Sequence, residues 1–426
     1  MKAYVCTNGC PENRIDAALM RKLLIENGFE PTNDNREADL CLFNACALTE
    51  DMEENSIVIV ERLKAEGKPS SRLIVCGCLA KVNIVRLRQT YDGPTFGSDD
   101  IGALAEILNS QTNLEDLHVN TIIPWLGIKD QDRDGSSITR KALKHLFRES
   151  PFSPWLIVGP LFMKLTAGYY RSLCRQFTIC RTDDFGIKVS TGCANACSYC
   201  SVKLSRGHVK SKPIQNVVGE FREGLARGFK EFSLLGTDLG SYGMDQGTNI
   251  AALLKAITGI EGDYKIRVRN LHPSSLIQML PELLEVVRTG KISYISSALQ
   301  SGNDRILGLM NRHYKVEELK EAVQAIKREC PEMEMCTQVM VAFPGESEEE
   351  FKDTLTALGK MKYDFTEVYR FSPRANTAAS KMPYDIPEPV ARRRNHEAFT
   401  KALGYTTRAC LARSLRYGKP VKTMLN

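Results

Sequence analysis

The segment GIKVSTGCANACSYC, residues 186–200, joins an apolar, strand-like run to a loop that carries three cysteines. Cys193, Cys197 and Cys200 fall within eight positions, which is too dense for cysteines that serve only as small core side chains. A closed tetrahedral zinc site needs four protein ligands, and no His or Cys follows Cys200 until His208. The segment therefore predicts a site of three thiolates with one coordination position that the protein does not fill.

Two kinds of metal site compete for such a loop. Iron–sulfur clusters are held by cysteine thiolates, and a four-iron cluster with three protein thiolates keeps one iron open for another ligand. Zinc is the alternative, although catalytic zinc is usually built around His or carboxylate ligands. Fourteen cysteines without a secretory signal indicate a reducing compartment, where thiols bind metals rather than form disulfides. We therefore expect a cytoplasmic protein with an iron–sulfur cluster on this loop.

Strand-like runs alternate with helix-like segments from about residue 186 to residue 385. Six or so such units predict an α/β fold with a partial (β/α)6 barrel, similar to a TIM barrel. One boundary is well marked, because Ser347 and Glu350 form a capping box at the start of a helix. This places VAFPGE, residues 341–346, on a strand-to-helix loop at the functional mouth of the barrel.

The first 116 residues repeat a strand, a cysteine and a helix three times, in AYVCTNGC, ADLCLFNAC, RLIVCGC and the segments that follow them. Such alternation predicts a doubly wound parallel sheet, in which the carboxyl ends of the strands share one edge. Cys10, Cys46 and Cys78 each follow a strand, so we expect them to converge at that edge. The cysteines within the strands are expected to be buried side chains, namely Cys6, Cys41 and Cys76.

The cysteine loop, with Tyr199 before its last cysteine, resembles that of the radical SAM enzymes. Further motifs are similar to the methylthiotransferase branch of that family over most of residues 1–385: NGCPEN, NAC, CGCLA, GTDLGSYG, LQSGNDRIL, MNRHY, VAFPGESEEEF and FSPRANTAASKMP. The resemblance implies a radical SAM methylthiotransferase, which inserts a methylthio group at an unactivated C–H bond.

The resemblance also implies two 4Fe-4S clusters and S-adenosylmethionine, which acts as methyl donor and as radical source. The radical cluster is expected on Cys193, Cys197 and Cys200, and an auxiliary cluster that carries the sulfur on Cys10, Cys46 and Cys78. The matched motifs also imply the contacts to S-adenosylmethionine, which are Tyr199, Asp238, Gln300, Ser301, Pro344, Gly345 and Arg374. Arg206 is expected either to contact substrate or to pair with an acid, and no catalytic acid or base is assigned.

Two further segments complete the expected domain organisation. Residues 117–185 are too long and too apolar for a linker and are expected to form an inserted subdomain or a substrate-facing lid. Their most apolar part is interrupted by Pro160 and Lys164 and is too short to cross a bilayer, so no membrane partner is expected. Residues 386–426 are expected to form a basic helical segment, with nine Lys or Arg and one acid from Val390 onward. We expect no TRAM domain, the small β-barrel module with which family members that act on tRNA or ribosomal protein end.

The expected substrate is a peptide or protein side chain, for instance in a ribosomally made precursor, held by residues 117–185 and the basic segment. Methylthiolation of a tRNA adenosine is the alternative, because GTDLGSYGMDQGTN and LQSGNDRIL look most like members with that target. A reducing partner such as flavodoxin or ferredoxin and a sulfur donor are expected in both cases. An alternative from another class is a two-cluster electron-transfer or redox-sensing protein.

Overall fold

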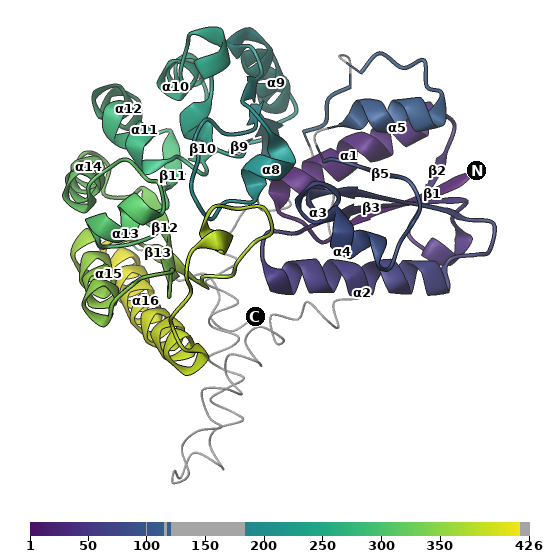
Figure 1. The fold of residues 1–426 in the computed structure, drawn as a ribbon. Coiled ribbons are helices and arrows are strands. Elements are labelled where there is room, and N and C mark those ends of the chain that lie inside the picture. The colour runs from purple at the N-terminus through teal and green to yellow at the C-terminus, as the bar shows by residue number, and fades with distance from the viewer. Residues whose placement is uncertain (99, 115–116, 121–183, 418–426) are drawn as a thin grey trace, which may run out of the picture.

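The computed structural model describes residues 1–98, 100–114, 117–120 and 184–417, which form two α/β domains (Figure 1). The N-terminal domain is a five-stranded, wholly parallel sheet with the order β2-β1-β3-β4-β5. Its strands are β1 (Lys2–Thr7), β2 (Glu30–Thr32), β3 (Leu40–Ala45), β4 (Arg72–Gly77) and β5 (Thr95–Phe96). Its helices are α1 (Pro11–Glu26), α2 (Glu50–Glu66), α3 (Cys78–Val82), α4 (Ile84–Arg88) and α5 (Ile101–Leu108).

Alternation along the strands gives the N-terminal sheet two buried faces. One face packs under α1 and α5, and the other packs under α2, α3 and α4. Cys6 and Cys41 lie on the second face, whereas Cys76 lies on the first, with its Sγ 3.7 Å from the Sδ of Met20. The doubly wound sheet is therefore confirmed, and the cysteines within its strands are buried as expected.

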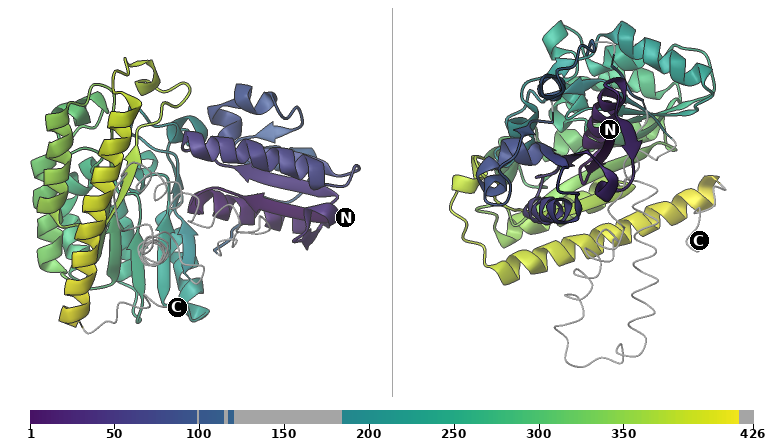
Figure 2. Two further views of the ribbon diagram at one scale, coloured as in Figure 1. Left: turned by 90° about the horizontal axis from the view of Figure 1, so that it is seen from below. Right: turned by 90° about the vertical axis from the view of Figure 1, so that its right-hand side faces the viewer.

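The second domain is a six-stranded parallel sheet with the order β13-β12-β11-β10-β9-β6. Its strands are β6 (Phe185–Lys188), β9 (Glu231–Leu235), β10 (Lys265–Val268), β11 (Ile292–Ser296), β12 (Glu334–Val341) and β13 (Phe365–Arg370). Its helices are α8 (Val202–Arg206), α9 (Ile214–Ala226), α10 (Ile250–Thr258), α11 (Pro273–Gln278), α12 (Leu280–Val287), α13 (Asp304–Leu309), α14 (Val316–Glu329), α15 (Glu348–Met361) and α16 (Glu388–Tyr417). Because β6 and β13 stand at opposite ends of this order, the sheet is the predicted partial barrel rather than a closed one (Figures 1 and 2).

Two helical segments are divided by local breaks. Between α3 and α4, the backbone of Asn83 is not helical, and its side chain accepts a hydrogen bond from the backbone N–H of Arg86 to start the second helix. Between α11 and α12, Pro281 lacks the N–H that a continuous helix would use and stands in the first turn of α12. A capping side chain and a proline therefore set these two boundaries.

The long helix α16 runs along β13, the strand at one end of the barrel sheet (Figure 2). Its Ala398 packs with Phe351 and Leu355 of α15, and farther along, Cys410 packs with Phe365 of β13. Covering the terminal strand in this way shields its unpaired backbone groups from other chains.

The two domains meet along the carboxyl ends of their strands, where α3 packs against α8 (Figure 1). The Glu12 carboxylate accepts a hydrogen bond from Thr237 Oγ1 at 3.1 Å across this boundary. Most of the expected 117–185 insertion and the last nine residues lie outside the described residues. Within the described ranges, no helix has the length and apolar character needed to cross a bilayer.

Candidate active site

The loop that carries Cys193, Cys197 and Cys200, called the radical-cluster loop below, lies between two short strands, β7 (Ser190–Thr191) and β8 (Lys210–Ser211). These strands pair antiparallel and close the base of the loop. Cys193, Cys197 and Cys200 are all half-buried on this loop. The backbone N–H of Asn195 donates to Cys193 Sγ at 3.3 Å, and its side-chain Nδ2 lies 3.5 Å from the same sulfur. Such N–H donors stabilise a thiolate, so the loop fits an iron–sulfur cluster.

Burial disfavours the charged form of two of these thiols. Burial, with the nearby Asp238 carboxylate, raises the pKa of Cys193 to about 11. Burial likewise raises the pKa of Cys200, with Cys197 as the second cause. Without a metal, Cys193 and Cys200 are therefore protonated at neutral pH, and metal binding would convert them to thiolates.

The second cysteine set lies across the boundary, at the carboxyl ends of β1, β3 and β4. Cys10 is exposed, Cys78 is half-buried and Cys46 is buried. The side-chain Oδ1 of Asn13 lies 4.0 Å from Cys10 Sγ and 3.8 Å from Cys78 Sγ. Cys46 and Cys78 both act electrostatically on Cys10, which places all three in one neighbourhood. The structure thus brings together the three cysteines that the sequence scatters over 69 positions.

Buried asparagines hold these cysteine loops to one another. Asn8 Oδ1 accepts a hydrogen bond from the backbone N–H of Cys46 at 2.9 Å, which ties the first loop to the second. Asn44 Nδ2 donates to the carbonyl of Asn13 at 3.0 Å. Glycine is required beside them, since a Cβ on Gly77, where φ is +100°, would lie 2.3 Å from Asn44 Oδ1. Asn13 Nδ2 is buried and has no partner among the described residues, which leaves a donor for a group held by the cysteines.

Neither set resembles a site for a single metal ion. In the described ranges, no three His, Cys, Asp or Glu side chains come close enough to share one ion. A tetrahedral zinc site would draw its thiolates to within about 4 Å of each other, whereas the thiolates of a 4Fe-4S cluster bind different irons.

Family models match the two domains separately. Residues 2–94 match the model described as Uncharacterized protein family UPF0004, and residues 187–358 match the Radical SAM superfamily. A probable threonylcarbamoyladenosine tRNA methylthiotransferase of Pyrococcus horikoshii is 31% identical, with 89% of this chain and 79% of that protein covered. The chain belongs to the methylthiotransferase family of radical SAM enzymes. This methylthiotransferase uses S-adenosylmethionine and 4Fe-4S clusters.

Other similar proteins agree with this family. The tRNA-2-methylthio-N(6)-dimethylallyladenosine synthase of Acetivibrio thermocellus is 30% identical, with 92% of this chain and 75% of that protein covered. Among solved structures, the radical S-adenosylmethionine methyltransferase TsrM of Kitasatospora setae superposes with a TM-score of 0.55 at 13% identity, covering 89% of this chain and 77% of that one. This structural likeness supports the fold of the methylthiotransferase and nothing about its substrate.

Of the residues expected to contact S-adenosylmethionine, Tyr199 packs against the segment before Pro344, and Gln300 is hydrogen-bonded through its backbone to β12. The ring of Tyr199 meets Phe343, which precedes Pro344, edge-on with 6.4 Å between centroids. Gln300 adopts a left-handed φ of +62°, and its buried Oε1 has no partner among the described residues. A buried acceptor without a partner on Gln300 fits a polar cofactor, and each of these cofactor contacts stays a prediction.

The remaining expected contacts have structural partners in the methylthiotransferase. The Asp238 carboxylate is buried and accepts hydrogen bonds from Asn195 Nδ2 at 2.7 Å, Ser241 Oγ at 2.5 Å and two backbone N–H groups. Ser301 is fully buried, and its Oγ accepts from the backbone N–H of Asn303 at 3.2 Å. Gly345 adopts φ +76°, and its carbonyl accepts from Arg305 at 2.6 Å. Their expected cofactor contacts stay predictions.

Arg374 forms a buried ion pair with Glu53 on α2 of the N-terminal domain. In this structure its side chain joins the two domains, and its expected contact to S-adenosylmethionine stays a prediction. Arg206 likewise pairs with an acid, Asp16, which is one of the two roles expected from the sequence.

Sequence reasoning missed a buried cation that reaches a cysteine of the radical-cluster loop. Arg312 is 6% exposed, and its Nη1 donates to the Tyr199 hydroxyl at 3.1 Å and lies 3.5 Å from Cys197 Sγ. Its other nitrogen, Nη2, donates to the carbonyl of Ala298, which follows β11. The MNRHY motif around Arg312 was matched to the family, but no pattern in the sequence indicated that its guanidinium would reach a cysteine 115 positions away.

Proposed function

We propose that this methylthiotransferase modifies an adenosine of tRNA by replacing the hydrogen of an unactivated C–H bond with a methylthio group. The observation that carries the proposal is the similarity to relatives named as tRNA methylthiotransferases, of which this chain spans 75–79% in the two described above. Nothing in the comparisons supports the peptide substrate that the sequence analysis favoured, so its alternative takes precedence.

The positive charge of the basic segment is not the reason for proposing an RNA substrate. In α16, Arg393 and Arg394 both pair with Glu348, at 2.6 Å and 3.2 Å, and Arg392 pairs with Glu388 at 2.8 Å. Farther along the same helix, Arg413 lies between acids of β12 and the loop before β13. The pairs with Glu348, Glu334 and Asp364 bind the helix to the barrel, whereas Arg392–Glu388 lies within the helix. Much of the positive charge of α16 is therefore already neutralised, and the helix has a structural role.

The two cysteine sets divide the chemistry between the domains. When bound, the radical cluster would supply the electron that cleaves S-adenosylmethionine, and the auxiliary cluster would carry the sulfur. Cys193, Cys197 and Cys200 would hold the first cluster, while the amide groups of Asn195 and the Arg312 guanidinium stabilise their thiolates. Hydrogen bonds across the boundary, such as that from Thr237 to Glu12, would help to hold the two sets at the interface between the domains.

The direct test is mass spectrometry of nucleosides from total tRNA, prepared from cells with and without the gene. We expect an adenosine derivative whose mass includes one added methylthio group to disappear on deletion and to return with the wild-type gene. The matched control is a gene with Cys10, Cys46 and Cys78 replaced by Ala, which is expected not to restore the modification. An unchanged nucleoside profile, together with a methylthio group found on a peptide, would overturn the tRNA proposal.

Salt dependence provides a second measurement. If the enzyme contacts about three phosphates of a single-stranded anticodon loop, the logarithm of its affinity should fall with the logarithm of salt concentration with a slope of about −2. Binding of an anticodon stem-loop that does not respond to salt between 50 and 200 mM would contradict the proposal.

A further inference from the structure

Arg206 is encoded next to the radical-cluster loop but lies against the other cysteine set. It ends α8, six positions after Cys200, and its side chain is 1% exposed. Its Nη1 donates to Asp16 Oδ2 at 2.5 Å, and its Nη2 donates to Asn13 Oδ1. Both acceptors belong to α1, the helix that follows Cys10, so the guanidinium crosses the domain boundary.

A single side-chain oxygen atom lies between this guanidinium and two of the auxiliary cysteines. The Asn13 Oδ1 that accepts from Arg206 is the same oxygen that lies 3.8 Å from Cys78 Sγ and 4.0 Å from Cys10 Sγ. Arg206 is therefore close enough to act on charge held by the cysteines.

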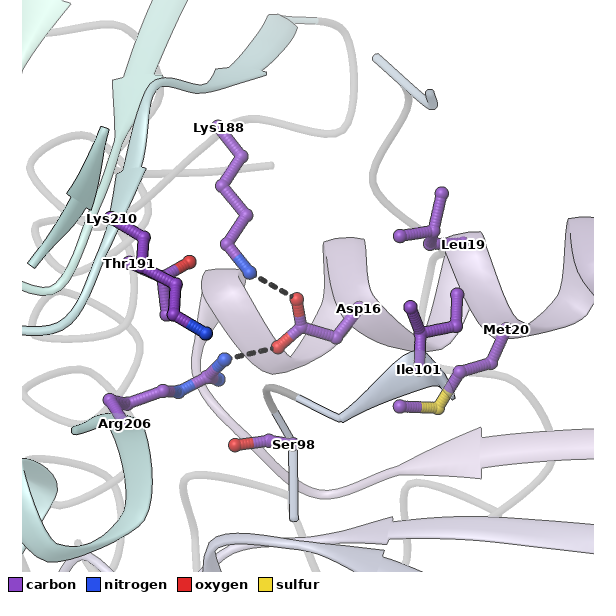
Figure 3. Close-up of a pocket in the computed structure, with 9 residues that line it drawn as sticks. All are labelled: Asp16, Leu19, Met20, Ser98, Ile101, Lys188, Thr191, Arg206 and Lys210. Carbon is purple, nitrogen blue, oxygen red and sulfur yellow. Dashed lines mark hydrogen bonds and ion pairs between the residues drawn. The ribbon is translucent and has the colours of Figure 1, made fainter. Parts of the chain in front are cut away.

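The Asp16 carboxylate does not neutralise the whole positive charge of Arg206, because this carboxylate also pairs with a second cation. The second carboxylate oxygen, Oδ1, pairs with Lys188 Nζ of β6 at 2.6 Å, so two cations face one carboxylate (Figure 3). These groups border a cavity of about 110 Å³ between the domains, which Ser98, Thr191 and Lys210 also line. In Figure 3 the Arg206 and Lys188 side chains approach Asp16 from the second domain.

We propose that Arg206 is a positioning residue that sets the reduction potential of the auxiliary cluster, so that the radical SAM domain tunes the site that carries the sulfur. The inference rests on the proposed ligands Cys10, Cys46 and Cys78. A cluster gains negative charge on reduction, and a fixed guanidinium beside it stabilises the reduced form and raises its midpoint potential. Hydrogen bonding to Asn13 fixes where this charge lies.

The arrangement links the potential to domain docking. Because the guanidinium comes from α8 and its acceptors from α1, the charge is present only while the domains stay together. The auxiliary cluster in the N-terminal domain thus has its tuned reduction potential only when the radical SAM domain is docked against that domain.

The experiment uses the full chain with Cys193, Cys197 and Cys200 replaced by Ala, so that the auxiliary cluster alone remains. In this background the midpoint potential is measured by electron paramagnetic resonance in a series of poised samples. R206Q is expected to shift the potential to a more negative value, and R206K, which keeps the charge, to lie between R206Q and the parent. D16N removes the opposing carboxylate and is expected to shift the potential in the positive direction. K188Q is the matched control, because it breaks the other half of the Asp16 pair and should shift the potential less than R206Q.

The sign of the D16N shift separates an electrostatic role from a structural one. Equal potentials in R206Q and the parent, or shifts of R206Q and D16N in the same direction, would overturn the inference. So would loss of cluster iron in R206Q, R206K and D16N alike, since that result marks a purely structural contact. Iron analysis of the parent background tests the proposed ligands of the auxiliary cluster by itself. None of these measurements needs tRNA, so they would stand even if tRNA were not the substrate.

Discussion

Replacing Glu53 or Arg374 alone is expected to destabilise the folded protein about as much as replacing both. These two side chains are 11% and 6% exposed and join α2 to the loop after β13, 321 positions apart in the sequence. The second carboxylate oxygen of Glu53 accepts a hydrogen bond from Asn83 Nδ2 at 2.8 Å, so the pair also supports the break between α3 and α4.

The size of the expected destabilisation follows from the burial of this ion pair. Removing one partner of a buried ion pair leaves the other charge without compensation and costs about 3–5 kcal/mol of unfolding free energy. E53Q retains an acceptor for Asn83, so we expect about 3 kcal/mol, and R374M should cost a similar amount. The double variant contains no unpaired charge and should cost at most about 3 kcal/mol, which gives a coupling energy of at least about 3 kcal/mol.

The assay is equilibrium unfolding in urea, followed by far-ultraviolet circular dichroism, for the wild type, both single variants and the double variant. The pair Arg288–Glu329, with exposed fractions of 55% and 35%, is the matched control and should give a coupling energy below about 1 kcal/mol. If the two single losses at Glu53 and Arg374 add to the double loss within about 0.5 kcal/mol, the argument from unpaired buried charge is wrong.

Three further predictions follow from the same structure. Anaerobic reconstitution should load about eight irons, and replacing Cys193, Cys197 and Cys200 by Ala should leave about four, as measured by iron analysis; a single zinc instead would contradict both sites. Ser347 accepts from the backbone N–H of Glu350 at 3.2 Å, so S347A should lower the unfolding free energy by about 1 kcal/mol in urea titrations, with S380A, at a half-buried serine, as a comparison that leaves the capping box intact. Burial raises the pKa of Glu346 from 4.5 to about 7, which means that the folded state binds a proton more tightly than the unfolded state. The stabilising effect is complete below pH 4.5 and is lost as the pH rises through 7, so the wild type should lose about 2–3 kcal/mol relative to E346Q between pH 5 and 8. A constant difference between these two proteins would contradict that assignment.

Local sequence patterns predicted much of the fold because they act over short distances. The alternation of strands and helices defined both sheets, and the Ser347–Glu350 pair marked the start of α15 correctly. Cys10, Cys46 and Cys78 were expected to meet because carboxyl ends of parallel strands share an edge, and the structure brings them together.

The missed features depend on how the domains dock, and no periodic pattern encodes that. The contact between Arg206 and Asp16 spans 190 positions, and that between Arg374 and Glu53 spans 321. Counting charges suggested a basic segment that helps to hold the substrate, whereas Arg393 and Arg394 are paired with Glu348. Net charge along a sequence says nothing about which charges meet after folding.

The covering of β13 by α16 has a consequence for synthesis on the ribosome. The N-terminal sheet uses strands that lie within residues 2–96 and can therefore form early, as domains generally fold as units while the chain emerges. The barrel sheet, in contrast, keeps its terminal strand uncovered until Glu388–Tyr417 has left the exit tunnel. During that interval β13 presents free backbone groups, and a nascent chain stalled before α16 would be a natural client for chaperones.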